Sequence, residues 1–193
     1  MILVIDTSSA RSAIALLRPD GSVAGEQVGP SGPLFGLAEG VRALREGRPL
    51  SRVAVAMGPG SFTGLRVGVS FGLGLAMGLK VPIVPLPTLA IQAARSDSPV
   101  LAVSEAGRGR VYHSALGGEA RLGEPGELPK EWPVVGWLKP ATQSALIAAG
   151  LLMQDESRLR SFGAAAAIVL ETARVVPYDS LRLEYMQSFV SKF

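Results

Sequence analysis

A glycine-rich segment between two apolar runs is the feature that most constrains the fold of this chain. It reads Gly58-Pro59-Gly60-Ser61-Phe62-Thr63-Gly64-Leu65-Arg66-Val67-Gly68 and follows Val53–Met57, in which every residue is apolar. A short, continuous apolar run predicts a buried strand, and the longer apolar stretch Leu65–Leu79 predicts a helix. The order strand, tight turn, helix N-terminus is typical of sheets covered by helices, and backbone N–H groups at such a helix start can hold anions.

Hydrophobic patterning through the first half of the chain predicts alternating strands and helices. The resulting order, β-β-β-α-β-α-β-α, is that of a ribonuclease-H-like domain, the unit duplicated in actin-like ATPases. The predicted fold class is therefore α/β, with a mixed five-stranded sheet flanked by helices. The expected strands are Met1–Asp6, Ser12–Leu17, Ser22–Val28, Ser51–Ala56 and Val81–Pro85, and the expected helices are Leu34–Arg45, Phe62–Leu79 and Thr88–Ala94.

The turn-like sequence Ser96-Asp97-Ser98-Pro99 predicts a domain boundary, which divides the chain into residues 1–96 and 97–193. A new hairpin, Val100–Ser104 with Arg110–Leu116, echoes the start of the chain. We therefore expect a second, reduced ribonuclease-H-like copy whose last segment, Leu181–Phe189, packs back on the first. The expected elements that remain are a loop at Gly117–Pro133, a short strand at Trp132–Trp137, and helices at Pro140–Leu152 and Phe162–Arg174.

Composition narrows the class of protein. The chain has 48% hydrophobic residues, enough for a sizeable core, and no cysteine, which excludes disulfides and thiolate metal sites. Its start lacks the pattern of a secretory signal, and Arg66 and five glycines interrupt the longest apolar stretch, so we expect a cytoplasmic protein without a membrane span. The net charge of +3 comes without a basic cluster with interleaved aromatic residues. The charge pattern therefore does not predict direct binding of RNA.

Two candidate sites each follow a predicted strand. Asp6, Thr7, Ser8 and Ser9 follow the first strand, where the residues either approach a nucleotide or simply shape the turn. The glycine-rich segment lacks the lysine of a P-loop, and its spacing does not fit a Rossmann fingerprint. The single histidine, His113, lies in mid-strand and has no metal-ligand partner in the sequence. We interpret it as a structural residue.

Glycine is unusually frequent in the helix that follows the turn. Gly64, Gly68 and Gly72 share one four-residue spacing, and Gly74 and Gly78 share another. Five glycines in a helix cost roughly 5 kcal/mol relative to alanine, so a close approach to another backbone must offset them. The approach is either to the chain's own sheet or to a partner's helix. Under the partner interpretation, Gly72→Leu should preserve the fold and weaken partner binding.

The signature loop, formed by Gly58, Pro59, Gly60, Ser61, Phe62, Thr63, Gly64 and Arg66, closely resembles that of the bacterial TsaB (YeaZ) family. The resemblance covers the first 95 residues well and the rest loosely. It implies an actin-like protein without catalysis that helps to place threonylcarbamoyl on adenosine 37 of tRNAs decoding ANN codons. The His-x-x-x-His metal pair of the catalytic paralogue, TsaD, is missing from Leu34–Arg45, so the resemblance implies no catalytic residue and no metal.

The resemblance also implies partners. TsaD would pair with the two N-terminal helices, the TsaE ATPase would join, and ATP or ADP would lie at the junction, with no cofactor held by this chain alone. The isolated chain would form a homodimer. The alternative is an active actin-fold phosphotransferase or ATPase. The expected partner interface comprises Leu34, Leu37, Val41, Leu65, Gly68, Val69, Gly72, Leu75 and Ala76.

Overall fold

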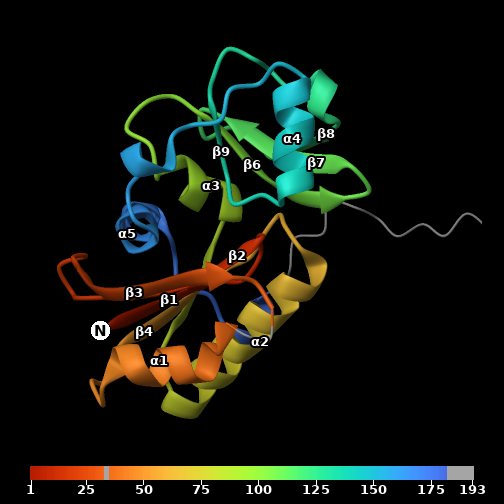
Figure 1. The fold of residues 1–193 in the computed structure, drawn as a ribbon. Coiled ribbons are helices and arrows are strands. Elements are labelled where there is room, and N and C mark those ends of the chain that lie inside the picture. Colours follow the sequence, from red (N-terminus) through yellow and green to blue (C-terminus); the bar gives the residue numbers. More distant parts are fainter. Residues whose placement is uncertain (33–34, 182–193) are drawn as a thin grey trace, which may run out of the picture.

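The computed structural model describes residues 1–32 and 35–181 of the chain, and its first half is built on one mixed sheet (Figure 1). The sheet has the five strands that the sequence predicts, and they lie side by side in the order β3-β2-β1-β4-β5. β2 pairs antiparallel with β1 and β3, whereas β4 pairs parallel with β1 and β5. The strands are β1 (Ile2–Asp6), β2 (Arg11–Leu17), β3 (Val23–Pro30), β4 (Arg52–Ala56) and β5 (Ile83–Leu86).

Helices cover both faces of this sheet (Figure 1). On one face, α1 (Leu37–Arg45) and α2 (Phe62–Leu79) pack on residues such as Leu3, Ile5 and Val53. On the other face, α3 (Thr88–Ala93) and α5 (Phe162–Thr172) pack on the alternate residues of the same strands. Because side chains alternate along a strand, each face receives its own apolar set. Helix α5 comes from the second half of the sequence yet covers the first sheet.

A smaller sheet in the second half repeats the strand arrangement of the first. Its order is β8-β7-β6-β9, with β7 antiparallel to β6 and β8, and β9 parallel to β6. This is the order of β3-β2-β1-β4, and no counterpart of β5 is present in the described part of the sheet. The strands are β6 (Leu101–Gly107), β7 (Arg110–Ala115), β8 (Arg121–Gly123) and β9 (Val134–Val135); helix α4 is Pro140–Ala148, and single 3-10 turns occupy Pro125–Glu127, Glu156–Arg158 and Tyr178–Ser180.

Two sequence-based expectations about elements need correction. The segment Gly117–Pro133, expected to be a loop, contains strand β8, whose three residues are too few to give a pattern. Helix α1 begins at Leu37, not Leu34, because Gly36 has φ +61° and interrupts the right-handed helix. Leu34 and the terminal segment after Leu181 lie outside the described residues. By length and a mean hydropathy of 1.4, α2 could cross a membrane despite its interruptions, although one side of it lies on the sheet.

Helix α3 lies between the two sheets and helps to join them. Its Ile91 packs into the core of the first sheet, and its Leu89 packs against Ala102 and Tyr112 of the second. The residue that follows this helix region, Arg95, is only 4% exposed. Its guanidinium forms an ion pair with Glu156 and lies 4.8 Å from the ring centroid of Trp137.

The glycines of α2 fall into two groups. A Cβ at Gly64 or Gly68 would overlap Thr7, and one at Gly72 would overlap the Val55 side chain. At Gly74 and Gly78, a Cβ would meet no atom within 4 Å. The first spacing therefore serves contact with the chain's own sheet, whereas the second is open to the outside.

Alanine substitutions on the two sides of α2 should have opposite effects. We expect Gly72→Ala to destabilise the fold by about 1–3 kcal/mol, because the new methyl overlaps Val55 in a packed core. Gly74→Ala should stabilise it by about 1 kcal/mol through helix propensity alone. Chemical denaturation of both variants measures this difference, and equal effects would contradict the assignment of the two faces. The same overlap overturns the expectation that Gly72→Leu preserves the fold.

The Arg95 contact should matter for the joint between the sheets. We expect Arg95→Met to lower the free energy of unfolding by about 3 kcal/mol, because a charge-assisted bond and a cation–π contact are both lost. Arg158→Met is the control, since its side chain is 79% exposed and its single ion pair spans 4.0 Å. If Arg158→Met lowered the free energy of unfolding as much as Arg95→Met does, the buried contact would contribute no more than an exposed ion pair.

Candidate functional site

Two sequence motifs that are fifty residues apart form one contact at the end of β1. The Ser61 N–H donates to the Ser8 carbonyl at 2.7 Å, and the Thr7 hydroxyl donates to the Gly64 carbonyl at 2.6 Å. A Cβ at Gly60 would lie 2.6 Å from the same Ser8 carbonyl oxygen. The glycines of the signature loop therefore allow its backbone to touch the turn after β1 directly. The Ser61 side chain also caps α2, because it accepts from the Gly64 N–H at 3.3 Å.

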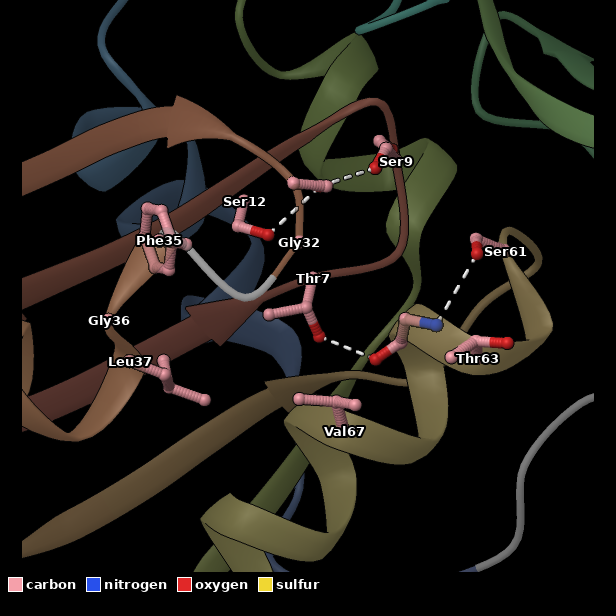
Figure 2. A pocket seen from close by; sticks show the side chains of 12 residues that line it. Thr7, Ser9, Ser12, Gly32, Phe35, Gly36, Leu37, Ser61, Thr63 and Val67 are labelled. Atoms are coloured by element: carbon pink, nitrogen blue, oxygen red, sulfur yellow. Dashed lines mark hydrogen bonds between the residues drawn. The ribbon is translucent and has the colours of Figure 1, made fainter.

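A cavity of about 490 Å³ opens beside this contact (Figure 2). The turn after β1, the segment between β3 and α1, and the first turns of α2 surround it. Six hydroxyl side chains and three apolar ones line it, and none of its twelve lining residues carries a charge. They are Thr7, Ser9, Ser12, Ser31, Gly32, Phe35, Gly36, Leu37, Ser61, Thr63, Gly64 and Val67.

Hydrogen bonds within the wall occupy most of these hydroxyl groups. Ser31 donates to the Ser9 carbonyl at 2.7 Å and shares a 2.9 Å bond with Ser12. The Ser9 hydroxyl is buried and has no partner within the described residues. An uncharged wall of this kind suits a neutral group with hydroxyl or amide functions. It offers no cation for a phosphate and no carboxylate for a metal ion.

The four residues predicted to lie near a nucleotide separate into two pairs. Thr7 and Ser9 line the cavity. Asp6 and Ser8 are fully buried beneath it, where one Asp6 oxygen accepts from the Ser8 N–H and hydroxyl at 2.8 and 2.6 Å. Ser8 continues this network to Thr88, whose hydroxyl accepts from the Gly58 N–H at 3.2 Å. Asp6 therefore supports the signature loop through this hydrogen-bond network and does not line the cavity.

Burial distinguishes Asp6 from two aspartates with the same local sequence. Asp20 and Asp155 also precede a serine by two residues and accept from its N–H and hydroxyl, but both are exposed. Those hydrogen bonds hold the pKa of Asp20 and Asp155 below the usual value. Desolvation instead raises the pKa of Asp6, whose second carboxyl oxygen has no partner in the described structure. The Asp-x-Ser pattern alone does not identify a site.

The structure also corrects the predicted partner interface. Leu37 and Leu75 are half-buried, and Leu34 lies outside the described residues. The other six predicted interface residues are buried against the first sheet, so they are not exposed to a partner. They are Val41, Leu65, Gly68, Val69, Gly72 and Ala76. Sequence spacing grouped residues that share a face of a helix, but that face packs against the sheet.

No group of three or more histidine, aspartate or glutamate side chains arranged to hold a metal ion occurs within residues 1–32 and 35–181. Among the described signature-loop residues, Phe62 and Arg66 project outward from α2, with the Arg66 guanidinium carbon 4.0 Å from the Phe62 ring centroid. The site at the end of β1 is thus a hydroxyl-lined cavity beside a tightly packed loop, without the charged groups of a hydrolytic centre.

Asp6 should make the stability of the chain depend on pH in the direction opposite to Asp20. Because burial raises the pKa of Asp6, the folded chain holds its proton more tightly than the unfolded chain, and stability falls as pH rises through that pKa. We expect Asp6→Asn to raise Tm at pH 7.5 by at least about 3 °C, the shift that about 1 kcal/mol produces at this size.

The gain from Asp6→Asn should shrink toward pH 4. Asp20→Asn is the control, because its lowered pKa means that the ionised group stabilises the fold above pH 4 and that this contribution is lost at lower pH. Thermal unfolding between pH 4 and 8 measures both. A Tm for Asp6→Asn that falls at neutral pH would contradict the destabilising burial of this carboxyl.

Comparison with known proteins finds similarity to proteins of tRNA threonylcarbamoyladenosine biosynthesis. Residues 45–125 match the family model of TsaD, tRNA N6-adenosine threonylcarbamoyltransferase. The tRNA threonylcarbamoyladenosine biosynthesis protein TsaB of Bacillus subtilis (strain 168) is 36% identical over 125 residues, which are 58% of this chain and 52% of that protein. TsaB of Escherichia coli (strain K12) is 37% identical over 68 residues, 33% of this chain and 29% of that protein. The matches span about half, or less, of these relatives.

The fold has a solved counterpart. The structure of YeaZ from Pseudomonas aeruginosa superposes with a TM-score of 0.76 at 21% sequence identity, and the match covers 96% of this chain and 99% of that one. The signature loop, the similar TsaB sequences and this shared fold agree. Part of the chain is thus similar in sequence to TsaB proteins, and its fold is that of YeaZ.

Proposed function

We propose that this chain is a noncatalytic subunit in the biosynthesis of threonylcarbamoyladenosine on tRNA. In this role it pairs with the catalytic TsaD subunit, which transfers the threonylcarbamoyl group to adenosine 37 of tRNAs that decode ANN codons. The names of the similar TsaB proteins support the pathway. The match of residues 45–125 to the TsaD family model supports common ancestry with the catalytic subunit. Related folds often pair through equivalent surfaces, which favours a heterodimer.

The outward face of α2 is the observation that carries the pairing. Val67 and Met77 are 52% and 53% exposed, and Gly74 and Gly78 between and beside them have open space above their Cα atoms. From Val67 to Leu79 the helix has no charged side chain. Two exposed glycines cost about 2 kcal/mol that no contact among the described residues offsets. Close approach of a partner's helix would offset it, as small residues permit at helix–helix contacts.

The remaining parts of the proposal follow from this placement. The TsaE ATPase would join the pair, ATP or ADP would lie at the junction, and contact between tRNA and this chain would be weak or indirect. In the absence of TsaD, the same uncharged face would pair with a second copy, since apolar surface that lacks its partner tends to find a substitute. We place the complex in the cytoplasm.

The alternative function, an active actin-fold phosphotransferase or ATPase, needs charged groups around a phosphate. The cavity at the end of β1 has none, and the nearby Asp6 carboxyl is buried beneath it. We therefore favour the noncatalytic role. A direct assay of ATP hydrolysis by the isolated chain distinguishes the two, and turnover above that of a buffer control would favour the alternative.

Substitutions on the outward face of α2 should abolish pairing and leave the fold intact. We expect Gly74→Leu and Met77→Glu each to weaken TsaD binding at least about tenfold, because one fills the close approach and the other buries a charge. Ile147→Glu on α4 is the matched control, since Ile147 is 58% exposed. Light scattering of mixtures with TsaD, followed by assay of tRNA modification, measures both steps. Equal binding by all three variants would sink the assignment of this surface.

A further inference from the structure

A second cavity, of about 600 Å³, lies beside the smaller sheet. It is walled by β7, β8 and the segment that leads into β9. Its lining differs from the first cavity because it contains four charged or titratable side chains and an indole ring. They are His113, Glu119, Arg121, Glu127 and Trp132. No part of the TsaD-pairing proposal uses this cavity.

Two of these side chains are placed by strand register. His113 on β7 lies directly opposite Arg121 on β8, so both project from the same face of the sheet. Burial and the adjacent Arg121 charge lower the pKa of His113, which leaves a neutral imidazole that can both donate and accept at neutral pH. The sequence predicted a structural histidine with its hydrogen bonds satisfied, but in the described structure no hydrogen bond reaches this ring.

The donor groups around the cavity lack partners. Within the described residues, neither the Arg121 guanidinium nor the Trp132 indole N–H makes a hydrogen bond or ion pair, and no cation–π contact joins the two. Elsewhere the chain uses the same groups differently, because Arg95 is paired with Glu156 and packed over Trp137. Arg121 is thus available to a ligand, as is the part of Trp132 that lines the cavity, while the rest of that ring packs against the core cluster around Leu101.

The acidic side chains of the cavity restrict which ligands can bind there. One oxygen of Glu127 accepts from the Glu124 N–H at 3.0 Å, which fixes the carboxylate at the rim and leaves its other oxygen free to accept. A simple anion would gain from Arg121 but would be repelled by Glu119 and Glu127. A ligand that satisfies the whole wall needs an anionic group, a flat apolar ring and a hydrogen-bond donor.

We propose that this cavity binds a nucleotide whose base carries an amino group, either free or as an unpaired unit of an RNA strand. The phosphate lies at Arg121, which binds phosphate oxygens in pairs. The base stacks on Trp132, as unpaired bases stack on aromatic side chains. Its exocyclic amino group donates to a glutamate, as cytosine does in nucleic-acid recognition. The volume lies within the usual range for small-molecule sites.

The single histidine of the chain makes a selective test possible. The imidazole proton signals of His113 report on this cavity and on no other site, so NMR titration of the full chain follows binding there. We expect AMP and CMP to shift these signals saturably, and UMP and inorganic phosphate to do so at least about tenfold more weakly. Arg121→Ala should raise the Kd for AMP at least about tenfold, and Arg174→Ala, which removes an exposed arginine elsewhere, should leave it unchanged.

Two results would overturn the proposal. One is the absence of a saturable shift with AMP or CMP at several millimolar; the other is the same Kd in the Arg121→Ala and Arg174→Ala variants. Trp132→Phe, which keeps a ring, should bind AMP better than Trp132→Leu, with folding of both checked by thermal unfolding. A short single-stranded oligoadenylate that binds more tightly than AMP identifies an RNA strand as the source, and equal affinity identifies the free nucleotide. Because the titration contains no TsaD, failure here leaves the pairing proposal unaffected.

Discussion

Direct contact between two backbones, without side chains between them, determines the geometry around β1. The turn after that strand touches the signature loop through Ser61 and Gly64, and every glycine on the inward side of α2 belongs to this contact or continues it along the sheet. Because these glycines carry no Cβ, the backbone of α2 lies directly against Thr7 and Val55. The position of the cavity, the burial of Asp6 and the direction in which the rest of α2 faces all depend on that approach.

Helix α2 has an inward face that packs on the sheet and an outward face that is exposed. Its inward glycines are required by sterics, since any side chain at Gly68 or Gly72 would collide with Thr7 or Val55. Its outward glycines, Gly74 and Gly78, meet no other part of the described residues, so packing within this part of the chain does not require them. The same residue type on one helix is therefore required by packing at some positions and not at others, and only the three-dimensional structure separates the two groups.

Local patterns predicted the first sheet well and the sites less well. The five strands and α2 follow from continuous or alternating apolar runs, which reflect burial directly. Strand β8 and the start of α1 at Leu37 depend on short segments and on a single backbone angle at Gly36, for which the sequence carries little signal. The inward face of α2 was mistaken for a surface because helical spacing shows which residues share a face but not what that face contacts. His113 and Arg121 come together only through strand register.

Helix α5 covers the first sheet but is encoded by residues 162–172, after the whole of the second sheet. While the chain is being synthesised, residues 1–96 can therefore form five strands with only one face fully covered. The apolar side chains of the other face, such as Val4 and Leu86, wait for Phe162 and Leu170 to emerge from the ribosome. Until then the nascent chain presents an apolar surface on this face, and the order of synthesis makes the docking of α5 the step that covers it.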